Sequence, residues 1–203
     1  SPLPSRLKRK KRKNSLQQID MAILNWIQAH LTGGFLTQVL RVVTYFGEFG
    51  AGWILIALIL LCRKKTRRTG LTMGAALLLG LVFGELLLKN LIQRPRPFML
   101  RPEVSLLIFE PFGYSFPSGH ATSSFAAAVS LFFCNRRLGA AALAQAAPIA
   151  FSRMYFFVHF LTDVLFGAAL GTGCAFLARF LIQRAAQRGS AGRAGPAGGR
   201  EGL

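Results

Sequence analysis

The stretch GLTMGAALLLGLVFGELLL, residues 70–88, contains one charged side chain, Glu85, among nineteen residues. About 20 predominantly apolar residues make a helix that can cross the hydrocarbon core of a bilayer, so this stretch indicates a membrane-spanning helix. The sequence therefore predicts an all-α fold, an integral membrane bundle of six transmembrane helices, rather than a soluble protein with very apolar helices. The six apolar segments lie at about 22–46, 51–62, 70–92, 119–134, 138–152 and 160–183.

Basic residues are concentrated between and beside these segments. The chain has 25 Lys and Arg against 7 Asp and Glu, a formal net charge of +18. Clustered Lys and Arg can bind nucleic acid, but clusters that flank long apolar segments are typical of topology signals in membrane proteins. With a cytoplasmic amino terminus, 19 of the 25 would fall on the cytoplasmic side. We therefore expect both termini to be cytoplasmic, and we expect no nucleic-acid partner.

The two ends of the chain differ in composition from its centre. Residues 1–20 are polar and basic, and we expect a disordered arm there, with Met21 as a candidate natural start. The Gly-, Ala- and Arg-rich residues 185–203 are expected to form a disordered tail. The six-helix domain would then span residues 21–184. The three cysteines lack the spacing of metal ligands, and their odd number indicates no disulfide framework.

Unusual polar residues gather at the outer face of the six-helix arrangement, where the third and fifth segments end and the fourth and sixth begin. Positioned cations, free N–H groups at a helix start and a nucleophile suit phosphoryl transfer. One Asp beside two His is a poor match for a two-metal hydrolase, so no metal or other cofactor is expected. The residues of this layer are Lys89, Arg96, Ser118, Gly119, His120, Arg153, His159 and Asp163.

Simpler interpretations remain open for several of these residues. Ser118, or Ser115, could do no more than cap the following helix. Lys89 could extend its ammonium group to the membrane interface. His159 and Asp163 are four residues apart and share one helix face, so they could form a structural pair, although ionisable residues within a membrane are usually functional.

Three motifs in this layer resemble those of the type 2 phosphatidic acid phosphatase superfamily, in the same order and with the same spacing. They run from residue 89 to residue 163. The first is similar to Lys-x6-Arg-Pro, the second to Pro-Ser-Gly-His and the third to Ser-Arg-x5-His-x3-Asp. Their residues here are Lys89, Arg96 and Pro97, then Pro117, Ser118, Gly119 and His120, then Ser152, Arg153, His159 and Asp163.

The resemblance implies a role for each matching residue. His159 would be the nucleophile and form a phosphohistidine, Asp163 would orient and polarise it, and His120 would protonate the leaving oxygen. Members of this type need no metal, so the resemblance also implies none here. The phosphate would be held by Lys89, Arg96, Ser118, Gly119 and Arg153.

We therefore expect a lipid phosphatase of the bacterial cell membrane, with its active site facing the outer side. Its substrate would be undecaprenyl diphosphate, phosphatidylglycerol phosphate or phosphatidic acid. Two alternatives stay open: a lipid phosphotransferase that uses the same site, and a non-catalytic transporter on the same scaffold. The sequence does not indicate an oligomeric state.

Two acidic residues lie outside the motifs. Glu48, between the first two segments, could touch a substrate head group, although a solvated loop position is the simpler interpretation. Glu85 lies one helical turn before Lys89, so we expect a structural pair between them.

Overall fold

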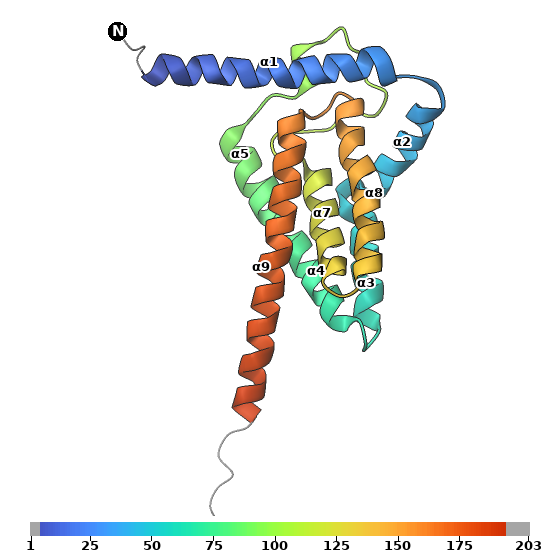
Figure 1. The fold of residues 1–203 in the computed structure, drawn as a ribbon, viewed down its shortest axis with the longest axis vertical. Helices are drawn as coiled ribbons and strands as arrows, with labels where there is room; N and C mark the ends of the chain where they lie inside the picture. The colour runs from blue at the N-terminus through green and yellow to red at the C-terminus, as the bar shows by residue number, and fades with distance from the viewer. Residues whose placement is uncertain (1–4, 194–203) are drawn as a thin grey trace, which may run out of the picture.

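The computed structural model describes residues 5–193, and every regular element among them is helical. The predicted all-α fold is therefore confirmed for this part of the chain. Figure 1 shows a helical bundle with one long helix, α1, lying across one end. In chain order the elements are α1 (Ser5–Leu31), α2 (Gly34–Phe46), η1 (Glu48–Gly50), α3 (Ala51–Cys62), α4 (Arg67–Gly80), η2 (Leu81–Leu88), α5 (Lys89–Ile92), α6 (Pro97–Leu100), α7 (Gly119–Phe132), α8 (Arg136–Tyr155) and α9 (Leu161–Arg193).

Helix α7 lies inside the bundle and packs against α4, α8 and α9. Its inward residues are small, and Ala121 and Ala126 are fully buried. On α9 the facing residue Gly171 has no room for a side chain, because a Cβ there would lie 2.1 Å from the carbonyl oxygen of Thr122. Small residues let helices approach closely in membrane proteins. This contact fixes α7 against α9 and brings the starts of the two helices together.

The first apolar segment, 22–46, does not form one span. Helix α1 ends at Leu31, and Gly33 adopts a φ of +137° before α2 begins. Only glycine adopts such a backbone conformation readily, so the chain turns sharply here. Helix α1 then lies across the end of the bundle while α2 turns into it (Figure 1). Leu24 and Ile27 hold α1 in place, because both are buried in the core.

By length and composition, two helical stretches of the described chain can cross a membrane, Arg67–Leu100 and Leu161–Arg188. Helices α2 and α3, which are bent by 48° relative to each other, make a third if they cross together. The prediction of six spans is therefore not confirmed. Helix α7 has 14 residues and is only about 21 Å long at 1.5 Å per residue, short of a hydrocarbon core of about 30 Å. The long apolar helices still indicate a membrane protein.

Both ends of the described chain differ from what the sequence led us to expect. Residues 5–20, expected to be disordered, form the first part of α1, and Asp20 is buried. Lys, Arg and Gln are good helix formers, so a strongly charged segment can continue the helix. At the other end α9 runs on to Arg193 rather than ending at 184. Residues 1–4 and 194–203 lie outside the described part.

The two ends of the described chain also lie at different ends of the bundle. Helix α1 lies at the end where α9 begins, whereas α9 finishes at the opposite end (Figure 1). The expected placement of both termini on one side is therefore not confirmed. The cause is the turn at Gly33, which gives the first segment one helix across the bundle and one within it.

Candidate active site

Four chain segments meet at the α1 end of the bundle: the end of α5, the start of α7, the end of α8 and the start of α9. Beside them lies a cavity of about 890 Å³, most of whose lining comes from the end of α2, from η1 and α3, and from α4 and η2. Six of the eight predicted site residues line it, and the other two, Ser118 and Asp163, are fully buried directly behind. The backbone N–H of Ser118 donates to the carbonyl oxygen of Asp163 at 3.1 Å. The six that line the cavity are Lys89, Arg96, Gly119, His120, Arg153 and His159.

His159 lies in the short connection between α8 and α9 and is 2% exposed. Its Nε2 is 3.2 Å from Nη1 of Arg96. A guanidinium can only donate, so Nε2 accepts and the ring proton is on Nδ1, which faces Oδ2 of Asp163 at 3.7 Å. That separation is longer than a hydrogen bond. The geometry therefore makes Nε2, the atom on the Arg96 side, the unprotonated nitrogen of the ring.

The protonation state of His159 agrees with this tautomer. Burial lowers the pKa of His159 to about 3, and the nearby charges of Arg96 and Arg153 act in the same direction, while Asp163 opposes them. The imidazole is therefore neutral at physiological pH. A neutral ring with a free electron pair is the form that can attack phosphorus.

Asp163, in the first turn of α9, is held by three donors. Its Oδ2 accepts from the hydroxyl of Ser115 and from the backbone N–H of Phe160, the latter at 2.9 Å. Its Oδ1 accepts from Nη1 of Arg94 at 2.6 Å. A buried carboxylate needs such partners, and together they fix Asp163 on one side of the His159 ring.

Arg96 follows α5 and precedes Pro97, the first residue of α6. Backbone carbonyl oxygens from two connections fix its guanidinium: Nε donates to Gly113 and Nη2 to Phe112, at 2.9 and 3.0 Å. Nη1 donates to Val158 at 3.0 Å. The planar group is therefore held in place before any anion arrives, which favours binding of phosphate oxygens.

Three buried side-chain nitrogens in the described part of the chain have no hydrogen-bond partner, and all three belong to this site. A buried polar group left unpaired costs about 1–3 kcal/mol. Two of the three face carboxylates without a hydrogen bond, Nε2 of His120 at 3.5 Å from Glu48 and Nδ1 of His159 at 3.7 Å from Asp163, so the unpaired Nε of Arg153 is the one that indicates a missing ligand. The atoms are Nε2 of His120, Nε of Arg153 and Nδ1 of His159.

The start of α7 is both a cap and a wall of the cavity. The Ser118 hydroxyl accepts from the backbone N–H of Ala121 at 3.5 Å, so the capping interpretation describes its side chain in this structure. Gly119 lines the cavity, and a Cβ there would lie 2.4 Å from Oε1 of Glu85. Free N–H groups in the first turn of a helix favour anions, and glycine leaves the backbone open to a ligand.

Acidic side chains also line the cavity. The expected pair between Glu85 and Lys89 is present, with Oε2 2.5 Å from Nζ. Both residues lie where α4 continues through the π-helical η2 into α5, and π-helical turns are frequent at functional sites. Glu48 does not lie in a purely solvated loop, since its Oε2 is 3.5 Å from Nε2 of His120.

The cavity extends from the histidines into the space between α3 and α4. That part of its lining is apolar, and it includes Gly74, where a Cβ would meet no atom within 4 Å. An apolar channel that opens from a cluster of cations suits an amphiphile with an anionic head. The apolar lining residues here are Ile54, Ala57, Leu58, Leu61, Leu77, Leu78 and Leu81.

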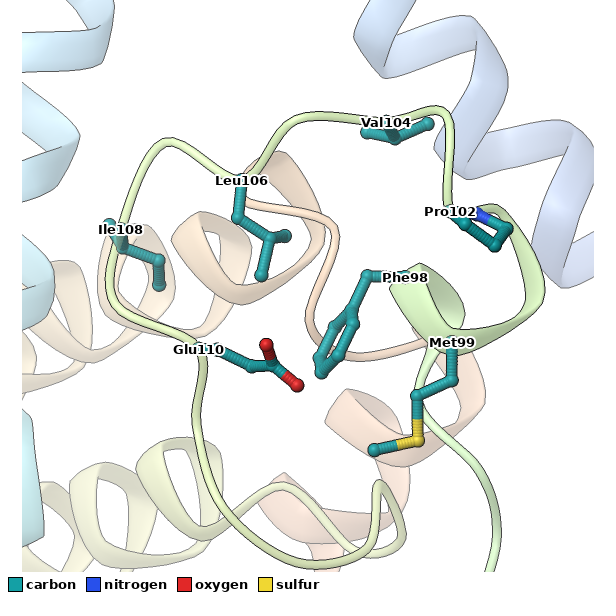
Figure 2. A pocket seen from close by; sticks show the side chains of 7 residues that line it. All are labelled: Phe98, Met99, Pro102, Val104, Leu106, Ile108 and Glu110. Carbon is teal, nitrogen blue, oxygen red and sulfur yellow. The ribbon is translucent and has the colours of Figure 1, made fainter.

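A second, more open pocket of about 470 Å³ lies under the connection between α6 and α7. Figure 2 shows Phe98, Met99 and Glu110 turned into it from different sides. Its lining contains no basic residue and neither histidine. This pocket therefore does not share the chemistry of the first.

Sequence reasoning missed several residues that hold the site together. Arg94 binds the carboxylate of Asp163, and Ser115 binds the same carboxylate rather than capping α7. Asp20 binds Arg94 at 2.7 Å although it falls in the segment expected to be disordered. One signal was available, because Asp20 is the only acidic residue among the first 20. Another was the repeated Arg-Pro at residues 94–97.

A family profile described as the PAP2 superfamily matches residues 69–187. The chain belongs to the PAP2 superfamily. This result confirms the resemblance that the three motifs indicate. The match also covers all eight site residues of this PAP2 protein.

Two relatives of this PAP2 protein are named phosphatases. Decaprenylphosphoryl-5-phosphoribose phosphatase of Mycolicibacterium smegmatis is 37% identical over 149 residues, covering 72% of this chain and 79% of that protein. Undecaprenyl-diphosphatase of Sulfolobus acidocaldarius is 33% identical over 126 residues, which cover 62% of this chain and 61% of that protein. With the family match, these names confirm the prediction of a phosphoric monoester or diphosphate hydrolase.

Two solved structures share the fold of this PAP2 protein. The transmembrane PAP2-type phosphatidylglycerolphosphate phosphatase of Bacillus subtilis superposes with a TM-score of 0.70 at 27% identity, covering 84% of this chain and 88% of that one. LpxE of Aquifex aeolicus superposes with a TM-score of 0.65 at 26% identity, and the match covers 79% of this chain and 94% of that one. The likeness therefore extends over most of both chains.

Proposed function

We propose that this PAP2 protein hydrolyses a phosphomonoester or diphosphate of a membrane lipid through a phosphohistidine at His159. The observation that carries the proposal is the state of His159: buried and neutral, with its unprotonated nitrogen on the Arg96 side. Four further groups around the cavity supply positive charge or N–H donors for the phosphate, namely Lys89, Arg96, Arg153 and the Gly119 backbone. Ser118 keeps that backbone in position by capping α7.

The reaction has two steps in this proposal. Nε2 of His159 attacks the terminal phosphorus, and the bond from that phosphorus to its leaving oxygen breaks, which is the lipid oxygen of a monoester or the bridging oxygen of a diphosphate. His120 gives its proton to that leaving oxygen. A water molecule then attacks the phosphohistidine and gives a proton to His120, which restores both histidines and releases inorganic phosphate. Asp163 stabilises the positive ring of the intermediate, and the cations stabilise the charge on the transferring group.

The apolar part of the cavity supports a lipid as the substrate. A chain lying between α3 and α4 would place its phosphate at the histidines, since one cavity contains both. Candidate substrates are undecaprenyl diphosphate, phosphatidylglycerol phosphate and phosphatidic acid. One relative is named for a decaprenylphosphoryl phosphoribose and another for undecaprenyl diphosphate, so among these candidates we place undecaprenyl diphosphate, the polyprenyl one, first.

Phosphate release by the purified protein tests this function. We expect chelator-insensitive release from one or more lipids in a panel of lipid phosphates and diphosphates. His159→Ala should reduce it by several orders of magnitude, the effect of removing a covalent nucleophile. Unchanged release by the purified variant would contradict the mechanism. A phosphorylated acceptor lipid in place of inorganic phosphate would identify a phosphotransferase, and no turnover of any lipid in the panel would favour a non-catalytic protein.

A further inference from the structure

A buried ion pair joins α1 to the active site. Asp20, near the middle of α1, is 1% exposed, and its Oδ2 accepts from Nη2 of Arg94 at 2.7 Å. Thr162 supplies two more donors, its backbone N–H to Oδ1 at 3.1 Å and its hydroxyl to Oδ2 at 2.6 Å. Asp20 does not line the catalytic cavity, so an effect of this residue on catalysis must pass through its partners.

Arg94 connects this pair to the aspartate beside the nucleophile. Its Nη1 donates to Oδ1 of Asp163 at 2.6 Å and to the Thr162 hydroxyl at 2.7 Å. The guanidinium also lies over the ring of Phe160, 3.9 Å from the centroid. These contacts hold Arg94 between two buried carboxylates, and it too stands outside the cavity lining.

Asp20, Arg94 and Asp163 form a row of alternating charges that ends at the His159 ring, and their order matters for His159. Asp163 has Arg94 on one side and the His159 ring on the other, and a cation bound to a carboxylate weakens the field that the carboxylate exerts on its second neighbour. Asp20 neutralises Arg94. The row of two carboxylates and one guanidinium therefore keeps one net negative charge beside the ring that becomes positive on phosphorylation.

We propose that Asp20 and Arg94 are positioning residues for the His159–Asp163 pair, and that α1 is therefore part of the catalytic unit. The inference rests on the proposed phosphohistidine mechanism. Arg94 holds Oδ1 of Asp163, so that Oδ2 faces Nδ1 of His159. Asp20 balances the charge of Arg94, so that Asp163 can stabilise the imidazolium formed when Nε2 binds phosphorus.

The first test replaces charge without changing shape. For Asp20→Asn we expect kcat to fall about 10-fold, the lower end of the loss seen when a partner that orients a metal-binding histidine is removed, with KM within about twofold of the parent. In single-turnover experiments with a ³²P-labelled lipid phosphate, the phosphoenzyme should form more slowly. Asn25→Ala is the matched control, because Asn25 lies on the same helix and bonds Arg101 away from the site; its kcat should be unchanged.

A double-mutant cycle separates positioning from general stability. If Asp20 acts through Arg94, Asp20→Asn combined with Arg94→Gln should have the kcat of Arg94→Gln alone, whereas independent effects would multiply. Each kcat is normalised to the folded fraction, measured by size-exclusion chromatography and thermal unfolding in detergent. Parental kcat per folded Asp20→Asn molecule, or losses that multiply, would overturn the inference.

The same experiments distinguish this inference from the proposed function. If His159→Ala retains turnover, the phosphohistidine mechanism fails whatever Asp20→Asn does. If His159→Ala is inactive while Asp20→Asn keeps the parental kcat, the mechanism stands and only the role of Asp20 and Arg94 fails.

Discussion

His120 and His159 belong to one cavity but have different surroundings. His159 accepts a hydrogen bond from Arg96 and faces Asp163 with its other nitrogen. His120 has a carboxylate as its near neighbour, Glu48, and no hydrogen-bond partner at Nε2. Burial lowers the pKa of His120 and Arg153 acts in the same direction, while the carboxylate of Glu48 favours the protonated ring. Beside His159, the guanidinium of Arg96 favours a neutral ring. The two environments fit one proton donor and one nucleophile.

Glu48→Gln should weaken His120 as the proton donor. We expect kcat to fall about 10-fold for a lipid phosphate, by analogy with the loss of a partner that orients a metal-binding histidine. The loss should be much smaller for p-nitrophenyl phosphate, whose leaving oxygen needs little protonation. Glu103→Gln is the matched control, because Glu103 pairs with Arg101 in the connection outside the cavity. Equal losses with both substrates would contradict a role for Glu48 through His120.

The residues that the sequence predicted to be neighbours lie close together along the chain, although Arg96 and His159 stand just outside the helices that carry their partners Lys89 and Asp163. His159 and Asp163 are four apart, and Lys89 and Arg96 are seven apart. Asp20 and Arg94 are 74 residues apart and belong to segments with no common pattern. Their contact depends on where α1 docks, which local spacing does not encode.

At the scale of elements, the close contact between α7 and α9 sets the geometry of the site. Gly171 permits that contact, and it lies two turns after Asp163 on the same helix. The start of α9 carries Asp163, and the start of α7 carries Gly119 and His120. A change in the separation of the two helices would therefore move the carboxylate relative to the anion-binding helix start.

Gly171→Ala should destabilise the protein, because the added Cβ would overlap the backbone carbonyl of Thr122. Overpacking of this kind costs about 1–3 kcal/mol, and thermal unfolding in detergent measures it. Gly173→Ala on the same helix is the matched control, since a Cβ there meets nothing within 4 Å. The midpoint temperature of unfolding of Gly173→Ala should stay the same or rise, because alanine is a better helix former than glycine. Equal midpoints for the two variants would show that the contact is not tight.

Hydropathy predicted the existence of most helices but not the direction of the first. Residues 22–46 read as one apolar segment, although Gly33 and Gly34 both take positive φ values and turn the chain. A glycine pair permits such a turn without requiring it. The packing of Leu24 and Ile27 on the core decides the outcome, and these are tertiary contacts that a hydropathy pattern cannot show.

At the scale of the whole molecule, basic residues gather at both ends of the bundle, since the seven Lys and Arg of residues 6–13 belong to α1, at the end where α9 begins (Figure 1). The basic turn at 63–68, between α3 and α4, and the pair Arg136–Arg137, at the start of α8, lie at the end opposite to α1 (Figure 1). Lys and Arg in short loops mark the cytoplasmic side of a membrane protein. Because α1 adds seven basic residues at the other end, this rule by itself does not choose the side that the active site faces, and an outward-facing site stays a prediction.

Cysteine labelling tests this orientation. Cys134 is exposed in the turn between α7 and α8, at the end opposite to α1 (Figure 1). In right-side-out membrane vesicles it should react with a membrane-impermeant maleimide only after permeabilisation. A cysteine introduced by Glu103→Cys, in the connection near the cavity, should react without it. The reverse labelling pattern would place the active site on the cytoplasmic side.

The cavity that joins the histidines to the apolar space between α3 and α4 changes how the rate of this protein should be expressed. A substrate that keeps its chain in the bilayer reaches such a cavity by lateral diffusion within the leaflet. The amount of substrate per litre then matters less than its mole fraction among the surrounding lipids. Adding inert lipid at constant total substrate would slow turnover by surface dilution, although no molecule in solution has become scarcer.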